Sequence, residues 1–289
     1  MDAAGTNAGG AGGAGTSAGT SALGSAGGAG AKATLYVIPG SHACRTGMLM
    51  LEHKRIPFRT VELFTGAHPY LLRILGFPGN KQPIRTVDGR THRSLALIDR
   101  MGTVPALRYG SEHVQTNRAI ARFLDRVQPQ PPLFPADAER RAAVEDAERW
   151  GDEVLQMAAR RIALAAAARD TAEMHDRGGS GRLGALLSHK RAVRAVHGQV
   201  AARVAFRANP NTEPKLLAEL PQMLDHVDQL IAAGVLNGAE LNAADFTIAP
   251  SVALLSYRHD LREQIAARPA GAMIDRILPM PPATAAAAA

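Results

Sequence analysis

The sequence has a single cysteine, Cys44, among 289 residues. One cysteine excludes an internal disulfide and any zinc or iron–sulfur site built from several thiolates, and it is typical of a reducing compartment such as the cytoplasm. The 10 histidines are scattered, with no pair four residues apart on an evident helix. The sequence therefore predicts no metal site.

Long apolar runs are also lacking, because no segment reaches the roughly 18 apolar residues needed to cross a bilayer. Residues 1–32 are mostly Gly, Ala, Ser and Thr, without the basic start or apolar stretch of a signal peptide. Such a composition cannot offset its ordering entropy, so we expect a disordered arm there and a second disordered tail over residues 279–289. The sequence predicts a cytoplasmic protein without a membrane partner.

A basic run with interleaved aromatics is missing too, although the net charge is +7 and the pI is near 10.1. Arg and Lys alternate with Asp and Glu along the chain, as in Glu139-Arg140-Arg141. This pattern is typical of a solvated surface and predicts no nucleic-acid partner.

The folded part is predicted to begin with a strand–helix–strand unit. Residues 34–38 are a short apolar, β-rich run that ends at Pro39-Gly40. Ser41 follows as a helix N-cap, and apolar residues then recur at helical spacing up to Ile56-Pro57. A second strand is predicted over residues 58–63. A unit of this length implies parallel pairing of the strands with a right-handed crossover.

Two similar segments follow a short helix predicted over residues 71–75, and either could be a hairpin that leads into a helix. One covers about residues 78–100, and the other begins at Thr103-Val104-Pro105-Ala106-Leu107. The second has the better apolar strand, and its helix continues to Phe123-Leu124. We therefore assign the second to the domain and treat residues 78–100 as an insertion.

A Pro-rich linker over residues 129–136 separates two halves of different character. The first half, residues 33–128, mixes strands and helices, whereas the second half, residues 137–278, is Ala-rich and has no convincing strand. Helices of the second half are predicted from Asp137, over residues 183–207, over residues 213–233 and from the capping box Asn242–Asp245. The sequence predicts two domains.

Three segments of the sequence, taken with their order and spacing along the chain, resemble the glutathione S-transferase family over about residues 33–265. The first runs from Leu35 through Pro39-Gly40-Ser41-His42-Ala43-Cys44-Arg45 to Lys54-Arg55-Ile56-Pro57-Phe58, and it is similar to the family's first strand, catalytic loop and helix. The second is Gly102-Thr103-Val104-Pro105-Ala106-Leu107, similar to the family's Val-Pro element with a cis proline. The third is the capping box at Asn242–Asp245. The resemblance implies an α/β thioredoxin-like N-terminal domain followed by an all-α C-terminal domain.

The resemblance places Ser41 where the family carries its catalytic Ser or Cys. A hydroxyl at a helix N-terminus can donate a hydrogen bond to a bound thiolate, at a place where free N–H groups also favour an anion. That bond would lower the pKa of the thiol of glutathione, the implied co-substrate. The alternative interpretation is that Ser41 only caps its helix.

Cys44 is the alternative active group. A thiol activated at a helix start would support glutathione-dependent reduction through a mixed disulfide. Cys44 lies on the same stripe as Met48 and Leu51, however, which favours a buried small hydrophobic residue. His42 could tune either group, or be a partly exposed loop histidine without a role.

The glutathione-binding residues implied by the resemblance are Val104, whose backbone would pair with the cysteinyl part, and the adjacent Pro105. The family's Glu-Ser or Gln-Ser pair, which holds the γ-glutamyl group, becomes Thr116-Asn117 here, or Gln115-Thr116 if the alignment shifts by one residue. An acidic partner for the ligand's ammonium group is missing from this pair.

The predicted function is that of a glutathione S-transferase, which transfers the glutathione thiol to an electrophilic small molecule in detoxification. Trp150, on the first helix of the second domain, would line the acceptor pocket or pack in the core. A homodimer is expected from the family alone. The alternatives are a catalytically inactive binding or interaction module with the same fold, which the missing acidic residue favours, and the reductase based on Cys44.

Overall fold

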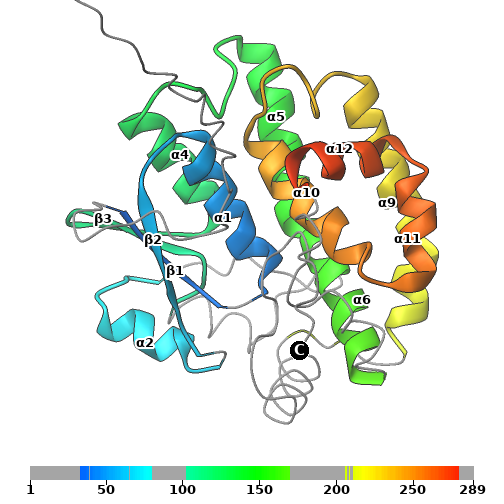
Figure 1. Cartoon of the computed structure of the whole chain (residues 1–289), viewed down its shortest axis with the longest axis horizontal. Coiled ribbons are helices and arrows are strands. Elements are labelled where there is room, and N and C mark those ends of the chain that lie inside the picture. The colour runs from blue at the N-terminus through cyan, green and yellow to red at the C-terminus, as the bar shows by residue number, and fades with distance from the viewer. Residues whose placement is uncertain are drawn as a thin grey trace, which may run out of the picture.

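The computed structural model describes residues 33–38, 40–64, 66–79, 102–169, 206, 208 and 211–279. The predicted arm, nearly all of the predicted insertion, the predicted helix over residues 183–207 apart from Phe206, and the tail after residue 279 lie outside these ranges. Figure 1 shows a small sheet with its helices beside a bundle of helices.

The sheet is built around the predicted strand–helix–strand unit. Strand β1 (Ala33–Val37) pairs in parallel with β2 (Phe58–Glu62), and α1 (His42–His53) connects them. The hairpin of β3 (Ala106–Tyr109) and β4 (Glu112–Gln115) completes the strand order β2-β1-β3-β4. The predicted second segment therefore supplies the domain's own hairpin. Its strand begins at Ala106, later than predicted, because Pro105 has no N–H to donate to a neighbouring strand.

Helices cover both faces of the sheet, with one hydrophobic core on each face. Because side chains alternate along a strand, neighbouring residues of the same strand belong to different cores. Leu35 and Leu107 belong to the core that includes α1 and α4 (Asn117–Val127). Their neighbours Tyr36 and Ala106 point the other way and pack with Leu72 of α2 (His68–Ile74). This layering of one small mixed sheet is the thioredoxin-like arrangement that the sequence predicts.

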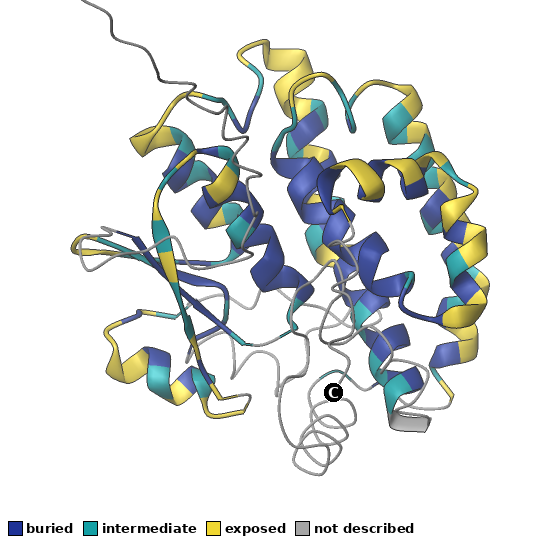
Figure 2. Cartoon of the chain, in the orientation of Figure 1, coloured by how far each residue is buried: buried dark blue, intermediate teal, exposed yellow. Residues whose placement is uncertain are grey.

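The second half is helical throughout its described part. Its elements are α5 (Ala138–Trp150), the π-helix η1 (Gly151–Leu155), α6 (Gln156–Arg169), α9 (Glu213–Ala232), α10 (Ala243–Leu255), α11 (His259–Ala266) and α12 (Pro269–Ile277). Asp137 caps α5, and Asn242 and Asp245 form the predicted capping box of α10. Every residue of α10 is buried, so this helix is the centre of the bundle (Figure 2).

One continuous core joins the two halves, because α1 packs against α10 while it also contacts β1 and α4. Figure 1 shows α1 between the sheet and the bundle. At its end, the fully buried Lys54 donates hydrogen bonds to Asp125 Oδ1 at 2.6 Å and to the carbonyls of Gln128 at 2.7 Å and Pro131 at 2.6 Å. These bonds tie the end of α1 to α4 and to the linker that follows α4.

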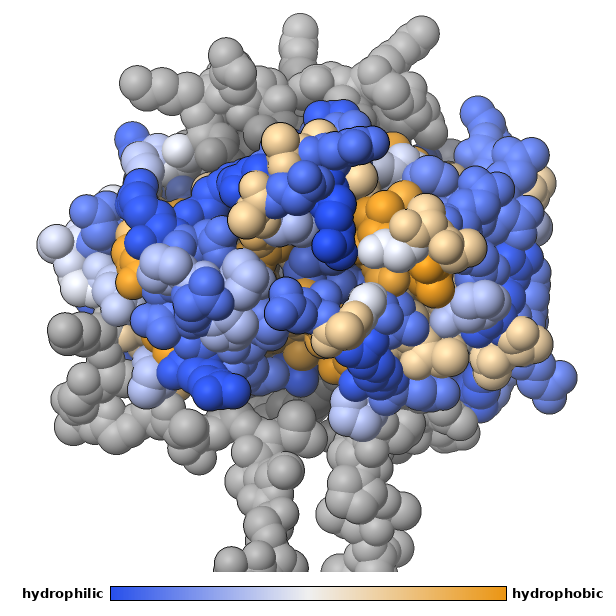
Figure 3. All heavy atoms as spheres, turned by 90° about the horizontal axis from the view of Figure 1, so that it is seen from above, coloured by the Kyte–Doolittle hydropathy of each residue, from blue (hydrophilic) through white to orange (hydrophobic). Residues whose placement is uncertain are grey.

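The surface is mostly polar where the structure describes it. On the face drawn in Figure 3, hydrophilic residues make up most of the described area, and the hydrophobic areas are small and separated. On α5, basic and acidic residues pair within the helix, as Arg141 does with Glu145 and Arg149 with Asp146. None of the described helices is both long enough and apolar enough to span a membrane.

Candidate active site at the start of α1

Three segments that are far apart in the sequence meet at the first turns of α1. Asn117, at the start of α4, donates a hydrogen bond from Nδ2 to the Ala43 carbonyl at 3.0 Å. Pro105 packs against the same helix at Gly47, where an added Cβ would lie 3.3 Å from Pro105 Cβ. The Val104–Pro105 peptide bond is cis, as the resemblance implies. The start of α1, the Val104–Pro105 segment and the start of α4 therefore form one candidate site.

Ser41 is the N-cap of α1, as predicted. Its backbone is extended, and its Oγ accepts a hydrogen bond from the Cys44 N–H at 3.3 Å. The side chain is only partly buried, unlike the residues of the first turn that follow it. A serine Oγ that accepts a bond still carries a proton, so Ser41 can donate that proton to a ligand atom at the helix N-terminus.

Cys44 is a buried thiol. Its burial raises the pKa to about 11, and the opposing effects of the Ser41 hydroxyl, the Ile38 backbone and the Arg160 charge are smaller. A thiol with this pKa stays protonated at neutral pH and is a poor nucleophile. The geometry therefore supports the interpretation of Cys44 as a small buried hydrophobic residue rather than as an active group.

Both amide atoms of the Gln115 side chain already have hydrogen-bond partners within the chain. Its Nε2 donates to the Thr103 carbonyl at 3.2 Å, and its Oε1 accepts from the Gly79 N–H at 2.9 Å. The residue is buried and holds the Val104–Pro105 segment against β4. Of the two alignments that the sequence left open, the structure thus favours Thr116-Asn117 over Gln115-Thr116.

Thr116 and Asn117 open α4 in an unusual geometry. Thr116 has φ 74° and ψ 145°, a region that β-branched residues rarely adopt, and its Oγ1 accepts from the Ala119 N–H at 3.3 Å. Asn117 Oδ1 is buried and has no hydrogen-bond partner among the described residues. Strained backbone and unsatisfied polar atoms of this kind concentrate at functional sites.

His42 is buried at the start of α1. It is the first residue of α1 and is 4% exposed, not a partly exposed loop residue. Its Nε2 is buried and has no hydrogen-bond partner within the described part of the chain. Burial, and to a lesser degree the charge of Arg160, hold the pKa of His42 well below its ordinary value.

Arg160 brings a positive charge from α6 toward the start of α1. Its Nη2 donates to Gln156 Oε1 at 3.0 Å, and its guanidinium lies 4.9 Å from the ring centroid of Phe206. The charge lowers the pKa of both His42 and Cys44, so it acts on the first turn of α1. No motif in the sequence marks Arg160, because it meets α1 only through the packing of the two halves.

Solved structures resemble the arrangement as a whole. A glutathione S-transferase of Ceriporiopsis subvermispora, solved in complex with glutathione, matches with a TM-score of 0.54 and 17% identity over 87% of this chain and 99% of that one. The chain has the glutathione S-transferase fold. A glutathione transferase of Phanerochaete chrysosporium matches with a TM-score of 0.53, 17% identity and coverage of 85% and 95%. The beta-etherase LigF of Sphingobium sp. matches with a TM-score of 0.51, 15% identity and coverage of 85% and 98%.

No protein-family model matches the sequence, and the comparison with curated proteins gave no match. At identities of 15–17%, the likeness to these structures concerns the glutathione S-transferase fold and not a particular activity.

Trp150 packs within the helical domain of this fold. Its ring lies edge-on against His226 of α9, with ring centroids 4.5 Å apart, and the side chain contacts the main core. The structure thus gives Trp150 the core position that the sequence analysis held as one of two alternatives.

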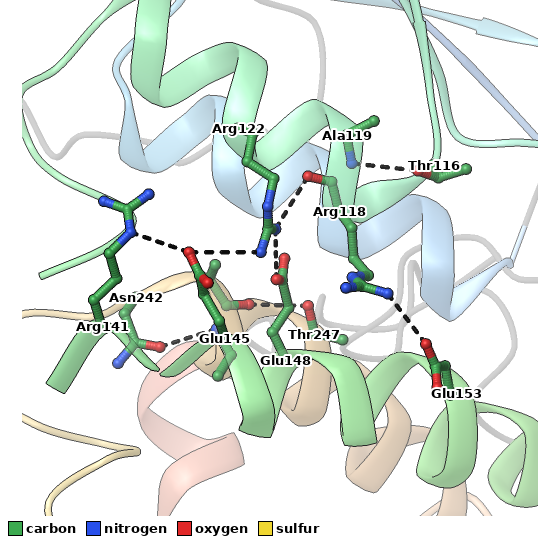
Figure 4. A network of polar contacts seen from close by, with 12 residues as sticks. Thr116, Arg118, Ala119, Arg122, Arg141, Glu145, Glu148, Glu153, Asn242 and Thr247 are labelled. Atoms are coloured by element: carbon green, nitrogen blue, oxygen red, sulfur yellow. Dashed lines mark hydrogen bonds and ion pairs between the residues drawn. The ribbon is translucent and has the colours of Figure 1, made fainter. Parts of the chain in front are cut away.

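Charged side chains connect α4 to α5 and to η1 (Figure 4). Arg122 donates to Glu148 Oε2 at 2.5 Å, and Arg118 donates to Glu153 Oε1 at 3.1 Å. Glu148 is fully buried, and burial raises its pKa to about 7 in spite of Arg122. Because Thr116 and Asn117 begin the same helix, these contacts position them relative to the helical domain.

Proposed function

We propose that this protein is a glutathione transferase, which binds glutathione at the start of α1 and transfers its thiol to an electrophilic small molecule. The observation that carries the proposal is the meeting of the Ser41-capped N-terminus of α1, the Val104–Pro105 segment and the start of α4. A solved structure with the same fold contains glutathione.

Ser41 would stabilise the reacting sulfur. Its hydroxyl donates a hydrogen bond to the thiolate, and the free N–H groups of the first turn of α1 add a favourable field. Both effects lower the pKa of the bound thiol and raise the concentration of the nucleophile. The sulfur then attacks the electrophilic carbon, and the leaving group departs with its electron pair.

The remaining groups would hold the peptide. Backbone atoms of Val104 pair with the cysteinyl part of glutathione, and Thr116 and Asn117 bind its γ-glutamyl part. Asn117 Oδ1, which lacks a partner in the described ranges, can accept a hydrogen bond from the ammonium group. A neutral amide attracts an ammonium less strongly than a carboxylate does, so we expect weaker glutathione binding than an acidic residue would give.

A second candidate is an inactive binding or interaction module of the same fold. The specific observation in its favour is that neither Thr116 nor Asn117 supplies the negative charge expected at this position. A module of this kind would bind glutathione weakly or not at all and would not transfer its thiol.

Calorimetric titration with glutathione, followed by a conjugation assay with an aryl halide, separates the two candidates. We expect binding by the wild type and a fall in kcat of about 100-fold in Ser41→Ala, as for loss of one hydrogen-bond donor to a developing anion. Ser111→Ala, in the exposed turn of the β3–β4 hairpin, is the matched control and should keep full activity. Binding without conjugation would favour the module, and absence of binding would refute the enzyme.

A further inference from the structure

The Val104–Pro105 segment lies just before the paired part of β3. The pairing of β3 with β1 and with β4 begins at Ala106, which lies opposite Gln115 of β4. In the stretch from Gly102 to Leu107 every residue is buried except Val104, which is half-buried. Val104 is therefore the accessible residue of this stretch, at a place where strand pairing does not hold the backbone. Its position has to be set by other contacts.

The side chain of Gln115 supplies such a contact. Its Nε2 donates to the Thr103 carbonyl at 3.2 Å, and its Oε1 accepts from the Gly79 N–H at 2.9 Å. Gln115 and Thr103 are each only 6% exposed, so little water competes for these bonds. Since a carbonyl can only accept and a backbone N–H can only donate, the amide fits in one orientation. Gln115 thus joins the end of β4 to the residue before Val104 and to the chain that follows α2.

Gly102 allows the backbone to come close enough for these bonds. Its φ of 149° lies in the region that favours glycine. An added Cβ would lie 2.9 Å from Leu72 Cβ of α2 and 3.3 Å from Gln115 Nε2. At the other end of the segment, Pro105 packs against Gly47 of α1. The segment is therefore held at one end by the Gln115 side chain and at the other end by α1.

We propose that Gln115 is a positioning residue for glutathione binding. Through the Thr103 carbonyl it fixes the backbone N–H and C=O of Val104 in the place where they pair with the cysteinyl part of the ligand. This inference rests on the proposed function. A backbone that is already in place binds without the cost of being ordered by the ligand. Loss of Gln115 should therefore weaken glutathione binding and leave the step at the sulfur, where Ser41 acts, largely unchanged.

The test compares Gln115→Met and Gln115→Glu with the wild type, by calorimetric titration with glutathione and by kcat and KM for its conjugation. Methionine fills a similar volume but forms neither bond. We expect its Kd and KM for glutathione to rise about 10-fold while kcat stays within about twofold, the opposite of Ser41→Ala. Thr247→Val removes another buried side-chain bond to a carbonyl, that of Ala243 in α10. As the matched control it should leave Kd and KM unchanged.

Gln115→Glu adds a readout that a change of packing alone would not give. A protonated carboxyl group can donate to the Thr103 carbonyl and accept from the Gly79 N–H, as the amide does, whereas a carboxylate can only accept. Burial keeps such a group protonated in mild acid. We expect the Kd of Gln115→Glu relative to wild type to be close to one at about pH 5 and to rise to about 10 at about pH 8. For Gln115→Met the same ratio should not change with pH.

Wild-type affinity in Gln115→Met, or a ratio for Gln115→Glu that is equal at both pH values, would overturn the assignment of Gln115. If Gln115→Met does not fold, the pH dependence of Gln115→Glu decides. Failure of the wild type to bind glutathione would refute the proposed function and this inference with it. Binding and conjugation by the wild type, together with wild-type affinity in both variants, would refute the inference alone.

Discussion

Ser41 and Cys44 share the first turn of α1 but differ in how accessible they are to a ligand. This difference determines which of the two can take part in a reaction with a bound molecule. Ser41 is partly exposed at the helix N-terminus, whereas Cys44 is buried beneath it. Burial of the Cys44 sulfur outweighs the effects of the Ser41 hydroxyl, the Ile38 backbone and the Arg160 charge, which would lower its pKa. A hydroxyl that can meet a bound thiol is therefore a better candidate for catalysis here than the protein's own thiol.

Alkylation by iodoacetamide should reveal how inert Cys44 is. With a pKa near 11, its thiolate is about 100 times scarcer at neutral pH than that of an unfolded cysteine. We expect native protein to react at least about 100-fold more slowly than denatured protein, and Cys44→Ala to keep its conjugation activity. Rapid native labelling together with an inactive Cys44→Ala variant would instead support the reductase.

Lys54 shows how one buried charge ties the end of α1 to α4 and to the linker. In Lys54→Met, Asp125 and the carbonyls of Gln128 and Pro131 lose their shared donor, and among the described residues Asp125 keeps the Leu133 N–H. Since a broken buried pair leaves an uncompensated charge, we expect a loss of about 3–5 kcal/mol in the free energy of unfolding, measured in urea. Lys215→Met, on the exposed face of α9, should change it by less than about 1 kcal/mol. A similar small effect at both positions would contradict this account of Lys54.

At the scale of the element, the π-helix η1 interrupts the long helix formed by α5 and α6 next to α10. Gly151 begins this turn, and an added Cβ would lie 2.7 Å from Ile248 Cγ1 of α10. Directly after η1 comes Gln156, the first residue of α6. Single π turns inside α-helices are frequent at functional sites, and here the turn lies directly before α6, which carries Arg160.

Gly151→Ala should therefore destabilise the bundle, because Ile248 has to move to make room. Overpacking of this kind costs about 1–3 kcal/mol, which thermal unfolding would detect. Gly238→Ala is a suitable comparison, since the nearest atom to its added Cβ is 3.7 Å away. Equal melting temperatures of Gly151→Ala and the wild type would show that α10 does not need this close approach.

The elements themselves were largely predictable from the sequence, because each depends on local chemistry. Ser41, Asp137 and the Asn242–Asp245 box begin helices in the structure as predicted. Bounds were less predictable, as for α2, which begins at His68 with a proline in its first turn rather than at Leu71. The π-helix left no local signal in the sequence, since it depends on how α5 meets α10.

At the scale of the whole molecule, the site is made by packing between the two halves, and that part was not predictable. The sequence suggested Ser41, Val104 and Thr116-Asn117 through a family resemblance. It gave no reason to connect His42 with Arg160, because these residues lie on helices of different domains. It also did not reveal that Gln115 is used internally. Such contacts follow only from the packed tertiary structure.

Glu148, which lies in the interface between the two halves, makes the stability of the protein depend on pH. Its folded-state pKa of about 7 lies above the ordinary 4.5, so between these values the folded protein keeps a proton that the unfolded chain releases. The free energy of unfolding should thus fall as pH rises from about 4.5 to 7, by up to about 3 kcal/mol. Glu148→Gln, which cannot ionise, should lose this part of the pH dependence in urea titrations. If wild type and variant keep a constant difference over this range, burial does not control Glu148.

The central claim is that a thiol is bound as an anion at the N-terminus of α1, beside Ser41. The most direct test is the ultraviolet absorbance of the thiolate of bound glutathione, followed as a function of pH in wild type and Ser41→Ala. We predict a bound thiol whose pKa lies at least about one unit below the ordinary value of about 8.5 in the wild type and returns toward it in Ser41→Ala. A bound thiol that titrates like free glutathione in both proteins would contradict the claim.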